Sequence, residues 1–437
     1  MILRRRNLSR LKEIGTILAR HGWGHVASRL GLARLLHLRG TASQEQGTPA
    51  RLVQALEELG PTFIKFGQLL STRSDLLPQG YIEELSKLQD TAPTIPIAYV
   101  REVISTELGG SPETIFAEFN DVPIAAASLG QVHSAVLHDG TQVIIKVQRP
   151  GIRDVVDRDI EILYTIASML ERRWERAKTY GLTEVVDEFA ITIREELDYT
   201  REAYNTQRLR TNLSKENRAR VPQVYWELVT QRVLTLERIN GIKITDERGL
   251  EALGIDIKDA ANALTSIFLH QIFVDGFFHA DPHPGNILVT PDHQIALIDC
   301  GQVRQLDASA RTGLLRLMIS FEHQQTRRFA EEIEALGISS GDVDLQALTR
   351  DLEKILRQYY DIPSRLANVG QILMRVMDVS ARHKIRLPVE FAVLGKVLAN
   401  IDGINRLLNS DFNFTEALRP YISRAVREQF AVDEMLT

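Results

Sequence analysis

The stretch HADPHPGN at residues 279–286, together with ALIDCG at 296–301, decides how the chain is interpreted. The segment between them, NILVTPDHQIALID, has two apolar runs around a turn signal and predicts a β-hairpin. Asn286 and Asp299 stand at the two ends of this hairpin, so we expect an amide oxygen and a carboxylate to lie side by side. Such hard oxygen ligands suit Mg²⁺ on the phosphates of a nucleotide. Asp281 is then left to meet a hydroxyl, as phosphoryl transfer requires.

The histidines of the same stretch allow a different interpretation. His279, Asp281 and His283 have the H-x-D-x-H spacing of a transition-metal site, which would make the protein a metal-dependent hydrolase. That alternative gives the hairpin amide and carboxylate no role, and it sets two prolines within the metal cage. We therefore interpret His279 as a structural histidine that hydrogen-bonds the backbone.

A second group of signals lies upstream, in AAASLGQV at 125–132 and VIIKV at 143–147. The phosphate loop of protein kinases has three glycines, and here alanine replaces the first two, which should stiffen the loop. A lysine in an apolar strand needs an anionic partner, such as phosphate oxygens or a helical glutamate. In LERINGI, backbone groups are suited to the edge of an adenine. The predicted nucleotide-binding residues are Ala125, Ala126, Ala127, Ser128, Gly130, Val132, Lys146, Glu237 and Ile239.

Candidates for the partner of Lys146 lie in REELDYTREAYN at 194–205. A helix predicted over 183–212 would place Asp198 and Glu202 on one face, with Glu196 projecting differently. Acidic residues on a helix are usually solvated surface. This stretch gains weight because Lys146 requires an anionic partner.

The order of these signals is that of a protein kinase, and the periodicity along the chain agrees with it. Helical patterns fill the first 115 residues, β-type runs follow at 116–148, and charged helices are predicted at 153–178 and 183–212. Short strands are predicted at 223–228 and 232–239. We expect an α+β, protein-kinase-like, two-lobed fold in three parts: a helical N-terminal extension at 1–115, an N-lobe with inserted helices at 116–240, and a helical C-lobe at 241–437.

Composition limits the other possibilities. The 437 residues carry a formal net charge of −5, so no global basic field indicates a nucleic-acid partner. Cys300 is the single cysteine, which excludes an internal disulfide and suits a reducing compartment. No window reaches the roughly 18 apolar residues of a membrane-spanning helix. The basic, amphipathic N-terminus is compatible both with a solvated helix and with one that rests on an anionic membrane.

The chain resembles the UbiB family of atypical, protein-kinase-like proteins, also called aarF-domain kinases. KFGQ at 65–68 matches the K-x-G-Q motif of that family, AAASLGQVH its alanine-rich loop, and ELD at 196–198 its E-x-D motif. HADPHPGN and the D-x-G sequence complete the set. The resemblance covers roughly residues 50–405, and the combination of motifs is highly specific.

The resemblance implies a role for each matching residue. Lys146 corresponds to the phosphate-binding lysine and Glu202 to its helical ion-pair partner. Asp281 corresponds to the catalytic-loop aspartate, and Asn286 and Asp299 to the metal ligands. A regulatory extension that in relatives occupies the peptide site is represented by Lys65, Gly67 and Gln68, which Glu196 and Asp198 face.

The family further implies binding of ATP or ADP with Mg²⁺, and kinase or ATPase activity that supports isoprenoid quinone (ubiquinone-type) biosynthesis. The extension blocks peptides, so the expected acceptor is a lipid or small molecule rather than a protein. Expected partners are an isoprenoid lipid or quinone precursor, quinone-biosynthesis enzymes and an anionic membrane surface. The expected location is cytoplasmic and peripheral at the inner membrane surface.

Three departures from kinase and family patterns qualify these expectations. Asp-Cys-Gly at 299–301 replaces Asp-Phe-Gly and puts the thiol beside a metal ligand. Ala280 stands where protein kinases have arginine, so control by a phosphorylated activation loop is not expected. The sequence ends without the hydrophobic helical hairpin of some bacterial members, which argues against integral anchorage. With alanines in the phosphate loop, a nucleotide-binding pseudokinase that presents lipid precursors to other enzymes is the alternative.

Overall fold

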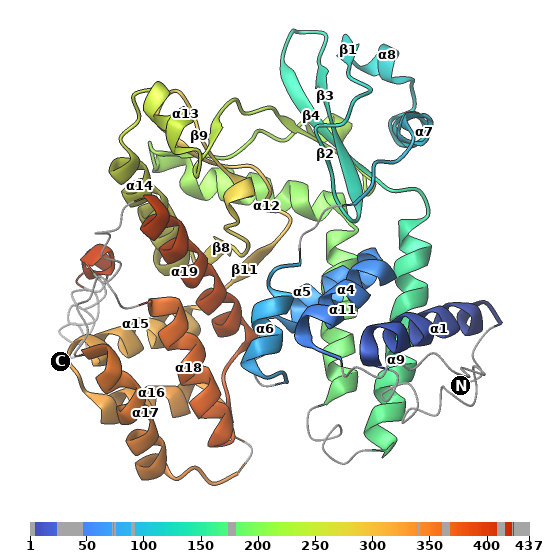
Figure 1. Cartoon of the computed structure of the whole chain (residues 1–437). Helices are drawn as coiled ribbons and strands as arrows, with labels where there is room; N and C mark the ends of the chain where they lie inside the picture. The colour runs from blue at the N-terminus through green and yellow to red at the C-terminus, as the bar shows by residue number, and fades with distance from the viewer. Residues whose placement is uncertain are drawn as a thin grey trace. The chain divides into compact units, whose positions relative to one another are not determined.

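The computed structural model describes residues 5–23, 47–71, 73, 76–88, 92–173, 181–339, 341–360, 368–408, 416–421 and 423. The chain forms two compact units (Figure 1). Unit 1 comprises residues 1–201 and 225–237, and unit 2 comprises residues 202–224 and 238–437. The predicted three-part division stays a prediction.

Unit 1 contains the antiparallel sheet expected between residues 116 and 148. Its strands are β1 (Glu118–Phe119), β2 (Ala125–Ala126), β3 (Gly130–Val136), β4 (Gln142–Gln148) and β6 (Val233–Glu237). They are ordered β1-β3-β4-β6, and β2 also pairs with β3. Alternate residues of β4, Val143, Ile145 and Val147, are fully buried and share a core with helix α7 (Ile97–Leu108). The alternation of apolar residues thus produced the predicted sheet with one buried face.

The remaining helices of unit 1 surround a second core. Apolar residues of α1, α4, α5, α9 and α11 form one buried cluster, and α5 contacts both α9 and α11. The bounds of these helices are α1 (Arg5–Leu18), η1 (Ala19–Trp23), α4 (Pro49–Leu59), α5 (Pro61–Leu70), α6 (Gln79–Leu85), α8 (Pro112–Ile115), α9 (Ile152–Arg173) and α11 (Leu182–Glu196).

Helix α1 turns its apolar face into this core. Leu11 and Ile14 are buried, and the Arg10 guanidinium donates to buried Asp159 from Nε at 2.9 Å and to the Leu59 carbonyl at 2.6 Å. The apolar stripe therefore packs against the protein.

The single helix predicted over 183–212 is wrong, because the chain breaks at Leu197. Leu197 leaves helical geometry at the end of α11, with φ −82° and ψ 2°, and its side chain is buried. The Asp198 carboxylate then accepts the backbone N–H of Thr200 at 3.0 Å, and a new helix, α12 (Tyr199–Asn212), begins. Asp198 is an N-terminal cap of α12, so it does not share a helical face with Glu202.

The strand predicted at 223–228 is also wrong. Tyr225 donates one backbone hydrogen bond to Thr235 of β6 at 3.1 Å, and Trp226–Leu228 then form a 3₁₀ turn, η3. The apolar run does not pair along its length, so β-propensity alone misassigned it. The neighbouring prediction at 232–239 is confirmed by β6.

Unit 2 is mainly helical and carries a four-stranded sheet ordered β5-β10-β9-β7. Its strands are β5 (Ala219–Arg220), β7 (Ile242–Lys243), β9 (Ile287–Val289) and β10 (Ile295–Leu297); the two-stranded pairs are β8 (Phe277–His279) with β11 (Val303–Gln305) and β12 (Ile338–Ser339) with β13 (Ile385–Arg386). The helices are α13 (Glu247–Ala252), α14 (Ile257–His270), η4 (Gln271–Asp275), α15 (Ala308–Glu322), α16 (Thr326–Leu336), α17 (Leu345–Tyr360), α18 (Val369–Arg382) and α19 (Val389–Leu408), with the short η2 (Leu213–Lys215) and η5 (Pro284–Asn286).

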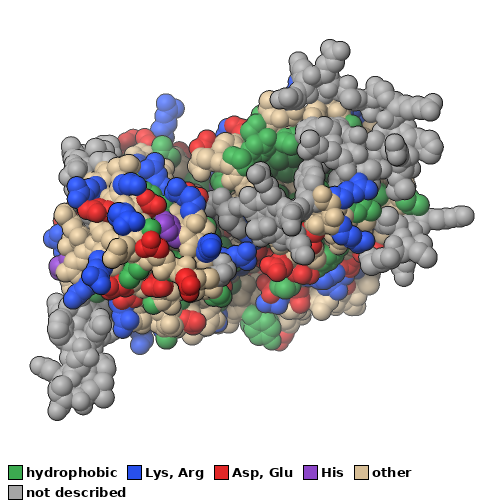
Figure 2. All heavy atoms as spheres, turned by 90° about the horizontal axis from the view of Figure 1, so that it is seen from below, with side chains coloured by type: hydrophobic (Ala, Val, Ile, Leu, Met, Phe, Trp, Pro, Cys, Tyr) green, Lys and Arg blue, Asp and Glu red, His purple; other side chains and the backbone are tan. Residues whose placement is uncertain are grey.

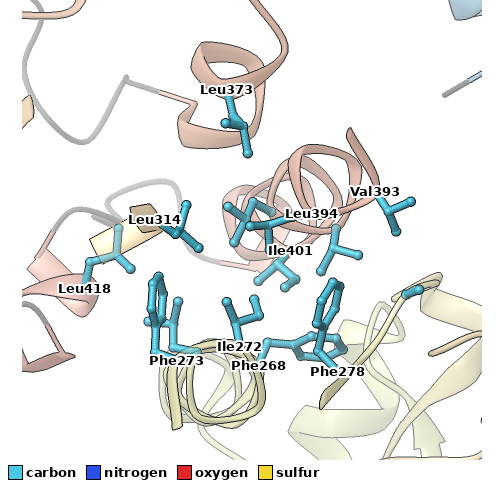
Figure 3. Close-up of a cluster of buried hydrophobic side chains, with 14 of the residues drawn as sticks. Phe268, Ile272, Phe273, Phe278, Leu314, Leu373, Val393, Leu394, Ile401 and Leu418 are labelled. Atoms are coloured by element: carbon cyan, nitrogen blue, oxygen red, sulfur yellow. The ribbon is translucent and has the colours of Figure 1, made fainter. Parts of the chain in front are cut away.

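One large apolar core supports the loops of unit 2. Figure 3 shows Phe268 and Ile272, from α14 and the following π-helical turn, facing Leu394 and Ile401 of α19. Phe278 of β8 lies in the same cluster and is fully buried. The strand that leads into HADPHPGN is thereby fixed to the core of the unit.

Figure 2 shows acidic and basic side chains interspersed on one face of the molecule. Among the described residues, no helix combines the length and the apolar character needed to cross a bilayer.

Candidate active site

The end of the β9–β10 hairpin brings together two of the predicted metal ligands. Strands β9 and β10 pair antiparallel, with Leu297 opposite Ile287. The Ile298 N–H donates to the Asn286 carbonyl at 3.0 Å, so Asn286 and the residue after Ile298, Asp299, lie at the same end of the hairpin. The hairpin thus places the backbone of the two residues as expected from the two motifs.

Asp281 belongs to the same cluster. The Asn286 amide nitrogen lies 3.4 Å from the Asp281 carbonyl and 3.5 Å from its Oδ2. The backbone N–H of Asp281 donates to Nδ1 of His279 at 3.1 Å. The loop between β8 and β9 is therefore held by its own polar groups, with Asp281 beside the hairpin end.

His279 is a structural residue, as its surroundings demonstrate. It is 1% exposed, its Nε2 hydrogen-bonds the Asp299 carbonyl, and its backbone N–H donates to Gln271 at 2.9 Å. Because Nδ1 accepts from Asp281 N–H, the ring is the Nε2–H tautomer and both nitrogens are engaged. His279 thus ties HADPHPGN to the Asp-Cys-Gly segment.

The metal-hydrolase alternative does not survive this geometry. His279 has no ring nitrogen left for a metal, and exposed His283 uses Nδ1 to accept the Gly285 N–H at 3.0 Å. Within the described ranges, no group of three or more His, Cys, Asp and Glu side chains is placed to hold a metal ion.

The Asp-Cys-Gly segment brings a further predicted residue to the site. Gly301 N–H donates to Asp299 Oδ1 at 3.1 Å. A methyl group built on Gly301 would lie 3.2 Å from that oxygen and 3.6 Å from Oε2 of Glu202, so both carboxylates border the same small space. Cys300 is 1% exposed and packs in the core of unit 2, which keeps the thiol away from solvent.

In unit 1, the alanine-rich loop is a closed turn. Ala125 and Ala126 pair with Val132 and Gln131, and the Ala127 N–H donates to the Gly130 carbonyl at 2.9 Å. Inside the turn, Ser128 and Leu129 are buried. These contacts close the turn, and the stiffness expected from its alanines stays a prediction.

Gly130 is required by packing. A methyl group on this residue would collide with the Tyr199 hydroxyl and would lie 2.7 Å from the Val147 carbonyl oxygen. The one glycine retained from the kinase pattern is thus explained by the close approach of Tyr199, at the start of α12, and of the next strand.

Lys146 lies on β4 beside this loop. In the sheet register it is opposite Val132 on one side and Leu234 on the other, and it is partly buried. Opposed residues place their side chains on the same face of a sheet, so Lys146 and Val132 share a face. Glu237 ends β6 opposite Val143, and Ile239 follows two residues later.

The K-x-G-Q motif lies on α5, and each of its three defining residues has a distinct contact. Lys65 Nζ forms an ion pair with Glu196 Oε2 at 2.9 Å, and the two side chains are 10% and 13% exposed. Gln68 donates to the Leu88 carbonyl at 3.1 Å. Gly67 has no room for a methyl group, which would lie 2.5 Å from Leu88 Cδ1.

A polar link that was not predicted from the sequence joins these motifs. Gln148 and Arg149, at the end of β4, donate hydrogen bonds to carbonyls of the alanine-rich loop and of the E-L-D segment. Nearby, buried Gln131 accepts the Ile95 N–H at 2.8 Å and contacts His133, whose pKa is lowered by burial. The only signal in the sequence was a glutamine within each apolar strand: Gln131 directly after Gly130, and Gln148 two residues after Lys146.

A pocket of about 260 Å³ in unit 1 lies on these linking residues. It is lined by Gln148, Arg149, Gly151, Ile152, Arg153, Asp154, Leu197, Gln231 and Arg232. None of the predicted nucleotide-binding residues contributes to this lining, so this pocket is separate from the predicted nucleotide site.

The chain is similar to known proteins over most of its length. The ABC1 atypical kinase-like domain family matches residues 87–333, and the UbiB helical domain family matches residues 352–413. A probable protein kinase UbiB from Pseudomonas entomophila is 38% identical over 87% of this chain and 72% of its own length. The chain belongs to the UbiB family.

The chain is also similar to a further relative and to a solved structure. An uncharacterized protein of Synechocystis, slr0889, is 37% identical over 90% of this chain and 97% of its own length. The structure of Rv3197 from Mycobacterium tuberculosis, solved in complex with erythromycin, matches with a TM-score of 0.55 and 26% identity over 84% of this chain and 94% of that one. The expected kinase-like α+β fold is confirmed.

Membership makes the chain an atypical kinase-like protein linked to ubiquinone biosynthesis. It agrees with the geometry of His279 in excluding a metal-dependent hydrolase.

Proposed function

We propose that the protein is an ATP- and Mg²⁺-dependent atypical kinase or ATPase that supports isoprenoid quinone (ubiquinone-type) biosynthesis. Its acceptor would be a lipid or a small molecule. The observation that carries this proposal is the cluster at the end of the β9–β10 hairpin, where Asn286 and Asp299 lie at one end and Asp281 contacts the Asn286 amide.

The donor atoms of this cluster fit Mg²⁺. Amide and carboxylate oxygens are the hard ligands that Mg²⁺ prefers, and soft or imidazole ligands are not needed. In the proposed site, Asn286 and Asp299 hold the ion, which would neutralise phosphate charge. Glu202 borders the same space beside Gly301.

Other residues of the chain would each have a separate role in the reaction. Asp281 accepts a proton from the attacking hydroxyl or water, and Lys146 binds phosphate oxygens. His279 keeps Asp281 and Asp299 in register because it bonds the backbone of both. Backbone groups of Glu237 and Ile239 would meet the adenine edge, and residues 125–132 would cover the phosphates.

The K-x-G-Q helix supports an acceptor other than a peptide. Helix α5 contributes Phe63 and Ile64 to the buried core of unit 1, and Lys65 is tied to Glu196. A protein substrate that needed this helix to move would have to break an ion pair and expose apolar surface. We therefore propose that α5 is a fixed part of the site, as the resemblance to the family implies.

The test is phosphate release from ATP in the presence of Mg²⁺ and vesicles of anionic lipid. Asp299→Asn should reduce the rate by at least about 100-fold, since it removes a charged metal ligand. Asp292→Asn, an exposed aspartate in the turn of the same hairpin, is the matched control and should keep the wild-type rate. Equal rates in wild type and Asp299→Asn would contradict the enzymatic proposal.

The pseudokinase alternative makes a different prediction in the same assay. Nucleotide would bind to the wild type and to Asp292→Asn, but neither would release phosphate above background.

Co-sedimentation with the anionic vesicles tests the proposed peripheral position at the inner membrane surface, and mass spectrometry of co-purified lipid tests the quinone-precursor class.

A further inference from the structure

Two consecutive residues at the end of β4 connect motifs that are far apart in the sequence. Gln148 is 3% exposed, and its Nε2 donates to the carbonyl of Leu197 at 2.6 Å and to that of Gln231 at 2.9 Å. Its backbone N–H donates to the Arg232 carbonyl at 3.0 Å. Leu197 is the middle residue of the E-L-D segment, so this segment is attached to β4.

Arg149 makes the corresponding attachment to the alanine-rich loop. Its backbone N–H donates to the Leu129 carbonyl at 3.0 Å, and its Nε donates to the Ala127 carbonyl at 3.1 Å. Its Nη2 donates to the Pro93 carbonyl at 2.6 Å. A guanidinium presents its donors in a rigid planar fork, so Arg149 fixes the loop relative to the chain before it.

The E-L-D segment reaches the loop by a second route. Tyr199 donates its backbone N–H to Gln231 at 3.1 Å, and its hydroxyl approaches Gly130 closely. Leu129 of the loop belongs to the same buried core as Phe63 of the K-x-G-Q helix. A shift of the E-L-D segment therefore cannot occur without disturbing contacts of the loop.

We propose that Gln148 and Arg149 are positioning residues that couple the Lys65–Glu196 ion pair to the alanine-rich loop and so set the relative affinity for ATP and ADP. The coupling runs from Lys65 to Glu196, through Leu197 and Gln148, and through Arg149 to Ala127. The nucleotide part of this statement rests on the proposed function; the coupling itself does not.

The first experiment measures the affinities for ATP and ADP by titration calorimetry. Arg149→Met should change the ATP-to-ADP affinity ratio by about fivefold, the equivalent of one net hydrogen bond. The change should have the same direction as that of Ala127→Gly, which loosens the same turn. Arg153→Met, an exposed arginine that lines the same pocket, is the control and should leave the ratio unchanged.

The double variant Ala127→Gly/Arg149→Met separates positioning from general destabilisation. If Arg149 acts through the loop, the double variant should change the ATP-to-ADP affinity ratio by less than the sum of the two single changes in free energy. Additive effects, or an unchanged ratio in folded Arg149→Met, would overturn the proposal. Arg149→Lys, which retains the charge but not the fork, should give an intermediate ratio.

Hydrogen exchange tests the coupling without nucleotide. Lys65→Met should accelerate exchange of the amides in 125–131 as well as those in 195–201. In a Gln148→Met background the added acceleration at 125–131 should be smaller, because only the Tyr199 route is left. Acceleration confined to 195–201 would overturn the coupling. If Lys65→Met accelerates exchange in 125–131 and the protein binds no nucleotide, the coupling is supported and the proposed function is refuted.

Discussion

The Lys65–Glu196 ion pair is the most telling contact at the scale of single residues. Both side chains are largely removed from water, and removal of one partner leaves the other charge poorly solvated. Lys65→Met should therefore lower the free energy of unfolding by about 3 kcal/mol, measured by urea denaturation.

The matched control is the double variant Lys65→Met/Glu196→Gln. It removes both charges and should recover most of the lost stability, because neither charge of the pair then remains in this weakly solvated position. A single variant as stable as the wild type, or a double variant no better than the single one, would contradict this view of the pair.

Gly130 gives a second prediction at this scale. Gly130→Ala should lower the free energy of unfolding by about 1–3 kcal/mol, because the added methyl group meets the Tyr199 hydroxyl and the Val147 carbonyl. Tyr199→Phe removes one of these obstacles and should partly rescue the variant. Gly80→Ala, where a methyl group meets nothing within 4 Å, should cost nothing. Equal costs at Gly80 and Gly130 would refute the packing argument.

Single residues also mark what the sequence can and cannot predict. The position of Asn286 and Asp299 at one hairpin end followed from local pattern, because a turn signal between two apolar runs determines the pairing. Gln148 and Arg149 were not predictable, because they bond backbone carbonyls 22 to 83 residues away along the chain. Their roles become visible only when the sheet places those carbonyls together.

At the scale of elements, the break between α11 and α12 explains the position of the E-L-D segment. Asp198→Ala should destabilise the protein by about 1 kcal/mol in urea denaturation, because it removes the acceptor for the Thr200 N–H. Asp198→Asn retains an acceptor and should be close to neutral. A similar loss in both variants would show that the charge, rather than the cap, is what matters.

The packing of α18 against α19 predicts that alanine at Gly370 and alanine at Gly403 change the stability in opposite directions. A methyl group on Gly370 would collide with the backbone of Ala399 and Gly395, so Gly370→Ala should destabilise the protein in thermal or urea unfolding. Gly403 is exposed on α19 with nothing within 4 Å, so Gly403→Ala should stabilise it by about 1 kcal/mol. The same sign for both variants would contradict the assigned helix packing.

The prediction of elements was wrong where a helical composition concealed a local capping signal. Residues 183–212 read as one helix by composition, but burial of Leu197 and the cap of Asp198 divide it. The break does have a signal in the sequence: Asp198 in D-Y-T can cap a helix that begins at Tyr199. The pairing of β8 with β11 was not predictable, since it joins short segments with no strong pattern of their own.

At the scale of the molecule, family membership and motif order agree on a kinase-like fold, and each unit carries a coherent part of the predicted site. Unit 1 holds Lys146, the alanine-rich loop and the K-x-G-Q motif. Unit 2 holds Asp281, Asn286 and Asp299. That these parts act on one nucleotide stays a prediction.

The most direct test of that prediction is a double-mutant cycle on the affinity for Mg²⁺–ATP, measured by calorimetry. Lys146→Met and Asp299→Asn should each weaken binding by about 10-fold or more, the loss of one charge-assisted contact to phosphate or metal. If both residues act on the same bound nucleotide, the double variant should lose less than the product of the two single losses. Two independent losses that multiply, or unchanged affinity in either single variant, would contradict the account.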